Sequence, residues 1–296
     1  MLSCLRDSFI LLRKNDPLRL AGATAFFSTF ALPPIVFILA QGFGLFVGPR
    51  RMGRELIEKV SLTLGADGAE QVKEVIRSIL GFNDSWQVII PGFIFLVFVA
   101  TTLFTVIRHS LDQIWQISVN EKPGVFFAVL NRTRSLGVII LAGLLLLTDI
   151  FLESLEVIAG NYVDAVWSQG SMYLKSFMAK IGSVFIVTAW FILLFRFLAD
   201  GQPKWKACIW GGLLTGILFT AGRLLLRVLF DNSNIGKLYG SSGSFVLVLL
   251  FVFYSSFILY YGACFIAVYS AKKGWPVTPG KKAFGFRVQQ VKKPVV

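Results

Sequence analysis

Six long apolar runs alternate with polar segments along the chain of 296 residues. A helix rises about 1.5 Å per residue, so about 20 apolar residues are needed to cross the hydrocarbon core of a bilayer. The pattern therefore predicts an all-α polytopic membrane protein, a bundle of six transmembrane helices in one domain over residues 1–275. The predicted spans are residues 20–47, 88–107, 136–158, 181–199, 207–230 and 244–270.

A short amphipathic helix is expected before the first span. Leu2, Leu5, Phe9 and Leu12 recur at helical spacing beside Arg6 and Arg13, a pattern typical of a helix lying at the membrane interface. Asp16-Pro17 then reads as an N-cap followed by a proline at the first position of the next helix.

The first loop, residues 49–87, predicts one or two further amphipathic helices. Its apolar residues follow the spacing of one helix face, and charged residues occupy the other. These helices would lie on the outer membrane surface or cap the bundle, and a packed lid with a structural purpose only is the favoured interpretation. The apolar face comprises Val72, Val75, Ile76, Ile79 and Leu80, and the polar face Glu70, Lys73, Glu74 and Arg77.

Composition excludes a soluble domain. Hydrophobic residues make up 55% of the chain, charged residues 15%, and the mean hydropathy is +0.71. So few polar residues could not cover the surface of a soluble protein of this size. The net charge of +13 suits contact with anionic membrane lipids. Nucleic acid is not expected as a partner, because the basic residues lie between and after the apolar runs.

The distribution of basic residues predicts the orientation. Loops on the side of the N-terminus carry 18 lysines and arginines, and loops on the opposite side carry nine. Cytoplasmic loops are the ones enriched in these residues, so both termini are expected in the cytoplasm of a bacterial inner-membrane protein. Residues 276–296 then form a basic cytoplasmic tail.

Two groups of charged residues fall inside the predicted spans. Asp149 and Glu153 lie about 20 and 26 Å along the third span, and Arg223 and Arg227 about 24 and 30 Å along the fifth. Opposite charges at one depth in a bilayer should pair, so the third and fifth helices are expected to face each other. Two interpretations stay open: an ionic clasp or arginines that reach the interface, and a hydrated cavity that handles a charged substrate.

Smaller features of the spans also carry predictions. Pro33-Pro34 should break the first span, because proline removes a backbone donor and clashes with the preceding turn. A stripe of Gly212, Gly216 and Thr220 should let another helix approach closely. Arg108, His109 and Arg196 lie near the cytoplasmic ends of their spans and are expected to reach lipid phosphates.

Nothing in the sequence suggests an enzyme. A single histidine, His109, and three cysteines without paired spacing offer no metal cluster, and no cofactor motif or catalytic constellation is present. The expectation is a protein without catalytic residues, metal or cofactor.

Several stretches together resemble the YihY/BrkB family of bacterial inner-membrane proteins. They are AGATAFFSTFALPPIVF at 21–37, RHSLDQIWQIS at 108–118, and the long segments 195–226 and 238–269. The resemblance covers nearly the whole chain and implies six spans with both termini inside. The family carries a virulence-factor label and an older ribonuclease label. The absence of an acid cluster facing the cytoplasm argues against the ribonuclease.

The resulting functional hypothesis is a transporter or exporter of a charged or lipid-like solute in the cell envelope. Arg223 and Arg227 would face the solute, and Asp149 and Glu153 would be their counter-ions. The alternative is a membrane scaffold that binds an envelope protein and transports nothing. Expected partners are membrane lipids, the solute, and an envelope protein or a second copy of the chain.

Overall fold

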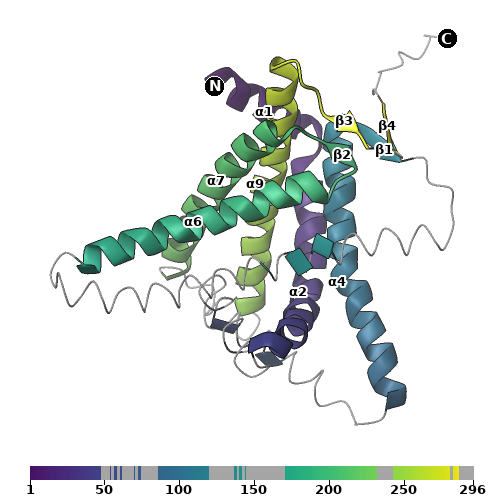
Figure 1. The fold of residues 1–296 in the computed structure, drawn as a ribbon, viewed down its shortest axis with the longest axis vertical. Coiled ribbons are helices and arrows are strands. Elements are labelled where there is room, and N and C mark those ends of the chain that lie inside the picture. The colour runs from purple at the N-terminus through teal and green to yellow at the C-terminus, as the bar shows by residue number, and fades with distance from the viewer. Residues whose placement is uncertain are drawn as a thin grey trace.

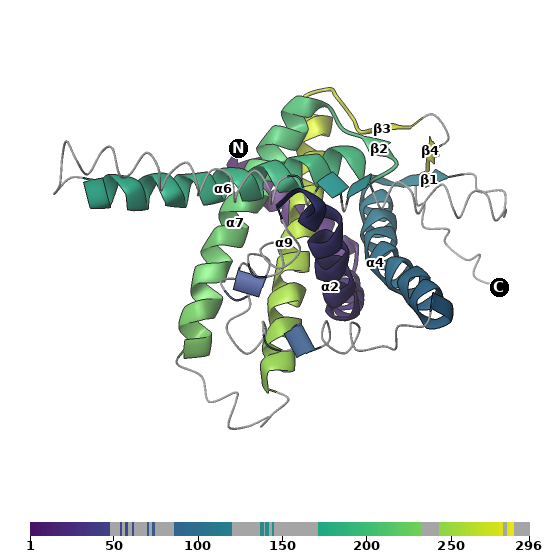
Figure 2. The ribbon, with the colours of Figure 1, turned by 60° about the horizontal axis from the view of Figure 1, so that its bottom comes forward.

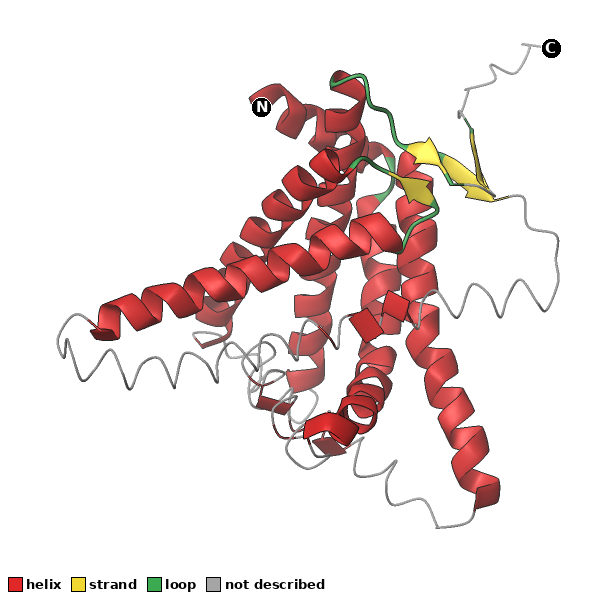
Figure 3. Ribbon diagram, in the orientation of Figure 1, coloured by secondary structure: helices red, strands yellow, loops and turns green. Residues whose placement is uncertain are grey.

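The computed structural model describes residues 1–47, 86–119, 171–231, 243–280 and 283–286. It also describes a few positions between these ranges, namely 54, 57, 58, 61, 70, 73, 74, 137, 138, 140, 141 and 144. The fold over these residues is mostly helical, with two short two-stranded sheets at one end (Figure 3).

Six helices form the described part of the fold (Figure 1). Each is rich in apolar residues except the first, which is amphipathic. In chain order they are α1 (Leu2–Lys14), α2 (Pro17–Val47), α4 (Trp86–Trp115), α6 (Ser171–Phe197), α7 (Trp205–Asp231) and α9 (Gly243–Lys272).

α1 is the amphipathic helix predicted at the N-terminus. Leu12 and Ser8 are buried on the side that faces α9, and the Tyr261 hydroxyl of α9 donates a hydrogen bond to the Leu5 carbonyl. Phe9 and Ile10 remain exposed. The chain turns at Asp16, whose φ is 51°, and α2 begins at Pro17 as the sequence predicts.

The long helices form a bundle in which α2 packs between α4 and α9, and α7 packs against α6 and α9. Figure 2 shows α6 crossing the other helices steeply, with its N-terminal half projecting away from them. The most completely buried side chains lie at the end of the bundle that carries α1. This set includes Leu12, Leu111, Phe195, Leu198, Phe265 and Ile266.

The outer surface of the bundle is apolar. Large side chains such as Phe95, Phe185 and Ile217 are more than half exposed, and an aqueous surface rarely tolerates so many of them. Within the described ranges, Trp205–Leu226 of α7 and Val248–Lys272 of α9 are long and apolar enough to cross a bilayer. These surfaces are what a lipid environment requires.

Glycine brings α6 and α7 together. A Cβ atom on Gly212 would lie 3.1 Å from the Ile192 backbone nitrogen, and one on Gly216 would lie 3.2 Å from Thr188 Cα. Only residues without a side chain permit this separation between two helices. The close helix approach predicted for the small-residue stripe of the fifth span is therefore confirmed at Gly212 and Gly216, and the partner there is α6.

The segment after α9 is folded back onto the bundle. β3 (Thr278–Pro279) pairs antiparallel with β2 (Gly201–Gln202), and β4 (Ala283–Gly285) pairs antiparallel with β1 (Ile117–Val119). The first part of the predicted basic tail thus joins the connectors that follow α4 and α6 (Figure 1).

Three of the six predicted spans agree closely with helices of the structure. α2, α7 and α9 begin and end within about three residues of the predictions, whereas α4 extends to Trp115 and α6 starts at Ser171. α2 also runs through Pro33-Pro34 without interruption, so the two prolines do not divide the helix. The third predicted span, 136–158, lies almost entirely outside the described residues.

Candidate functional site

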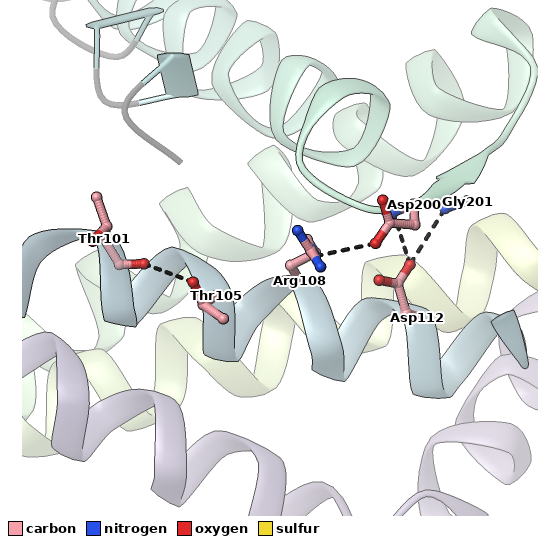
Figure 4. Close-up of polar contacts among 6 residues, drawn as sticks. All are labelled: Thr101, Thr105, Arg108, Asp112, Asp200 and Gly201. Atoms are coloured by element: carbon pink, nitrogen blue, oxygen red, sulfur yellow. Dashed lines mark hydrogen bonds and ion pairs between the residues drawn. The ribbon is translucent and has the colours of Figure 1, made fainter. Parts of the chain in front are cut away.

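The candidate site lies where the C-terminal half of α4 meets the connector between α6 and α7. Thr101, Thr105, Arg108 and Asp112 recur every three or four residues and so share one face of α4. Figure 4 shows the two charged side chains of this face reaching toward Asp200 and Gly201 of the connector. Asp112 lies beyond the predicted span 88–107, at the end of the bundle that carries both α1 and the C-terminal strands.

An ion pair forms the centre of this site. Arg108 Nε lies 3.1 Å from Asp200 Oδ2, and the exposed fractions of the two side chains are 3% and 16% (Figure 4). Charges removed from water this far are stable only when they are paired. The pair therefore fixes the α6–α7 connector against α4.

Asp112 holds the same connector through its backbone. Its Oδ1 accepts hydrogen bonds from the N–H of Asp200 at 2.9 Å and from the N–H of Gly201 at 3.3 Å. Burial and the neighbouring Asp200 carboxylate raise the pKa of Asp112 to about 7, although the two N–H groups and Arg108 oppose the shift. The site is thus an ionic cross-link that contains one buried carboxyl with a raised pKa.

Gly201 makes this close contact possible. A Cβ atom at this position would lie 2.6 Å from Trp115 and 2.7 Å from Ile117, both of which are buried. The connector can approach α4 closely enough for the Asp112 hydrogen bonds only because residue 201 has no side chain.

A buried hydrogen bond between two hydroxyl groups joins α2 to α9. The Tyr260 hydroxyl of α9 lies 2.5 Å from Thr24 Oγ1 of α2. Both side chains are buried. Hydroxyl groups that satisfy one another in this way let polar residues sit inside an apolar bundle.

The charged residues predicted from the sequence are only partly described. Asp149 and Glu153 lie outside the described residues. Arg223 and Arg227 both belong to α7. The Arg223 side chain is half-buried, and it makes no ion pair with the carboxylates in the described part of the chain; the Arg227 side chain is not described. The proposed pairing between the third and fifth helices stays a prediction. Pro34 is buried within α2.

Two of the arginines near the cytoplasmic ends of the predicted spans have partners within the protein. Arg108 does not reach lipid, because it is buried and paired with Asp200. Arg196 donates a hydrogen bond to the Pro203 carbonyl at 2.7 Å and lies 5.4 Å from the centre of the Trp205 ring. Both arginines hold the α6–α7 connector. Arg108 is too deeply buried to contact a lipid phosphate, whereas Arg196 is only half-buried.

Sequence reasoning missed Asp112 and Asp200 as members of the site. The two stretches that carry them, RHSLDQIWQIS and the segment that begins at Phe195, both contribute to the family resemblance. Their joint presence was the only signal that could have linked them. In the described part of the chain, no group of three or more His, Cys, Asp or Glu side chains gathers as metal ligands would.

Comparison with known proteins defines the class and then the family. The relatives are named membrane proteins, and together with the apolar surfaces of α7 and α9 they identify a helical membrane protein. The family model described as virulence factor BrkB matches residues 11–283, so the chain belongs to that family. No solved structure matches.

The relatives cover most of the chain at low identity. A UPF0761 membrane protein of Photobacterium profundum is 21% identical and covers 95% of this chain, which spans 87% of the relative. One from Pseudomonas paraeruginosa is 23% identical over 86% of the chain, and one from Pseudoalteromonas translucida is 24% identical over 82%. The chain spans 60% of the length of the Pseudomonas protein and 78% of the Pseudoalteromonas protein.

Proposed function

We propose that the protein spans the bacterial inner membrane six times with both termini in the cytoplasm. The described helix ends support this arrangement. The start of α2, the ends of α4, α6 and α9, and the start of α7 gather at one end of the bundle, where Lys272 Nζ forms a 2.6 Å ion pair with Asp7. Strict alternation of six spans would bring these same ends together.

Within this membrane domain we propose a transporter or exporter of a charged, anionic or lipid-like solute. The proposal rests on the position and surroundings of Arg223 in α7. This arginine lies about 27 Å along the apolar helix α7, is half-buried, and makes no ion pair within the described part of the chain. A cation at this depth is costly unless an anion or water meets it, and such residues in membrane proteins mark solute pathways.

The solute pathway in this proposal runs along the face of α7 that carries Arg223 and Arg227. Asp149 and Glu153 act as counter-ions while no solute is bound, and a passing anion displaces them. The scaffold alternative predicts instead that the same charges form a dry clasp between two helices.

Cysteine accessibility distinguishes the two proposals. The three native cysteines are buried and are replaced first. Thr220→Cys then places a thiol one turn before Arg223 on its half-buried face, and Leu224→Cys places one on the exposed apolar face as a matched control. A hydrated pathway lets a charged thiol reagent modify Thr220→Cys in native membranes while lipid protects Leu224→Cys. Protection of both positions would favour the scaffold.

A second comparison, in the same cysteine-replaced background, measures whether the pathway prefers anions or cations. If Arg223 attracts anions, an anionic thiol reagent modifies Thr220→Cys faster than a cationic reagent of similar size. Arg223→Ala should remove that preference while the protein keeps its melting temperature. Loss of folding in Arg223→Ala would instead support the structural clasp.

A further inference from the structure

We propose that the start of α7 forms a binding site for one anionic phospholipid, with cations for the headgroup and an exposed apolar stripe for an acyl chain. The cations are Arg196, Lys204 and Lys206, called here the α7 cation site. The inference rests on the membrane location proposed above and is independent of transport.

The α7 cation site is held in place by aromatic rings. Lys204 Nζ lies 4.9 Å and Lys206 Nζ 5.7 Å from the centre of the Trp275 ring, so both ammonium groups meet at one ring. Arg196 lies over the ring of Trp205, and Trp205 is the residue between Lys204 and Lys206 in the sequence. Cation–π contacts orient the side chains at little cost in hydration, which leaves their donors available to a phosphate.

In the described part of the chain, the acids near these cations are engaged elsewhere. Asp200, on the same connector, is directed toward Arg108 and α4 (Figure 4). Asp7 is paired with Lys272 at the end of α9. The positive charge of Lys204 and Lys206 is therefore presented outward, and both side chains are exposed.

An apolar stripe runs away from these cations along α7. Trp205, Ile209, Leu213 and Ile217 recur every four residues, so they share one face of the helix, and their exposed fractions are 48%, 49%, 37% and 52%. Phe197 of α6 extends the stripe beside Trp205, with ring centres 5.9 Å apart.

The combination points to a phospholipid. A soluble phosphate or a nucleic acid would use the cations and leave the apolar stripe uncovered, whereas a zwitterionic lipid would cover the stripe and gain little from three cations. Tryptophan beside lysine is also the composition found at membrane interfaces, where headgroup and acyl chain meet. Only an anionic phospholipid satisfies both parts.

The test measures lipid binding to the purified full-length protein by native mass spectrometry. Phosphatidylglycerol is the anionic probe, and phosphatidylcholine is the zwitterionic control. Lys204→Ala/Lys206→Ala should weaken phosphatidylglycerol binding about tenfold, since each basic residue contributes measurably to attraction of an anionic headgroup. Binding of phosphatidylcholine should not change.

The matched control removes the same charge from the same end of the molecule. Arg13→Ala/Lys14→Ala eliminates two exposed cations at the end of α1 and should change phosphatidylglycerol affinity less than about twofold. Equal losses in the two double variants would mean a diffuse surface attraction and would overturn the site. An unchanged affinity in Lys204→Ala/Lys206→Ala would overturn it too.

A second measurement tests the apolar stripe on the unmodified protein. Inorganic phosphate and a phosphatidylglycerol headgroup without acyl chains should each bind at least about tenfold more weakly than the intact lipid, because apolar burial contributes to lipid binding in proportion to chain length. Equal binding of phosphate and lipid would identify a site for free anions instead. Neither result alters the accessibility of Thr220→Cys, so the two proposals fail separately.

Discussion

At the scale of single residues, some charged side chains of this protein hold separate segments together, and others are candidate site residues. Arg108 looks from the sequence like a cation at the end of a span, facing phosphate. Its burial could not be foreseen, because the connector that supplies Asp200 comes about 90 residues later, and Asp112 and Asp200 are separated by 88 positions. Helical spacing identifies which residues share a face, but it does not say what covers that face.

The ion pair can be tested with a double-mutant cycle. Arg108→Ala leaves the Asp200 carboxylate without its arginine and should lower the free energy of unfolding by about 3 kcal/mol. Asp200→Ala in the same background should cost less than it does alone, with a coupling of at least about 1 kcal/mol. Denaturant or thermal unfolding of the purified protein measures both quantities.

The control for this cycle is Arg13→Ala, which removes an exposed arginine from α1 and should change stability by less than about 0.5 kcal/mol. Strictly additive effects of Arg108→Ala and Asp200→Ala would contradict the description of the two side chains as a pair.

At the scale of elements, the apolar runs predict helix boundaries well where a helix ends at the edge of its apolar run. α2, α7 and α9 match because polar or helix-breaking residues bound each run, as Pro17 does for α2. α4 continues past its apolar run because Arg108 and Asp112 pack against a connector rather than meeting water. The strands escape prediction, since segments of two or three residues leave no periodic pattern.

The close approach of α6 and α7 leads to a prediction about glycine. Gly212→Ala would place a methyl group against the Ile192 backbone and should destabilise the protein by about 1–3 kcal/mol, because neither helix backbone can yield. Gly182→Ala is the matched control in α6, where nothing lies within 4 Å of the new Cβ atom. It should be neutral or slightly stabilising, since alanine favours helix. Equal melting temperatures for both variants would refute the close contact.

At the scale of the whole molecule, one end of the bundle is closed by segments from distant parts of the chain. The Gly280 N–H donates to the Asp200 carbonyl and the Phe286 N–H donates to the Gln116 carbonyl, both at 2.9 Å. Residues after α9 thereby tie the α4 and α6 connectors together. Positive charge in residues 276–296 suggests a solvated tail, and nothing in their composition indicates this pairing.

Truncation after Pro276 should loosen this end without unfolding the helices. The loss of β3 and β4 leaves the partner strands unpaired, so amide hydrogen exchange at Ile117–Val119 should accelerate about tenfold. Truncation after Phe286 keeps both strand pairs and should leave these rates unchanged. Identical exchange in the two truncated proteins would show that the strands contribute nothing to this end.

The position of these strands in the chain also sets an order of assembly. A ribosome makes residues 278–285 only after every helix of the described bundle, and chains fold from the N-terminus as they emerge. The connectors after α4 and α6, which carry β1 and β2, therefore keep unpaired strand edges while the later helices enter the membrane. Closure of the bundle end therefore follows the synthesis of residues 278–285, and a chain that stalls before them is left with exposed strand edges, which can pair with other chains.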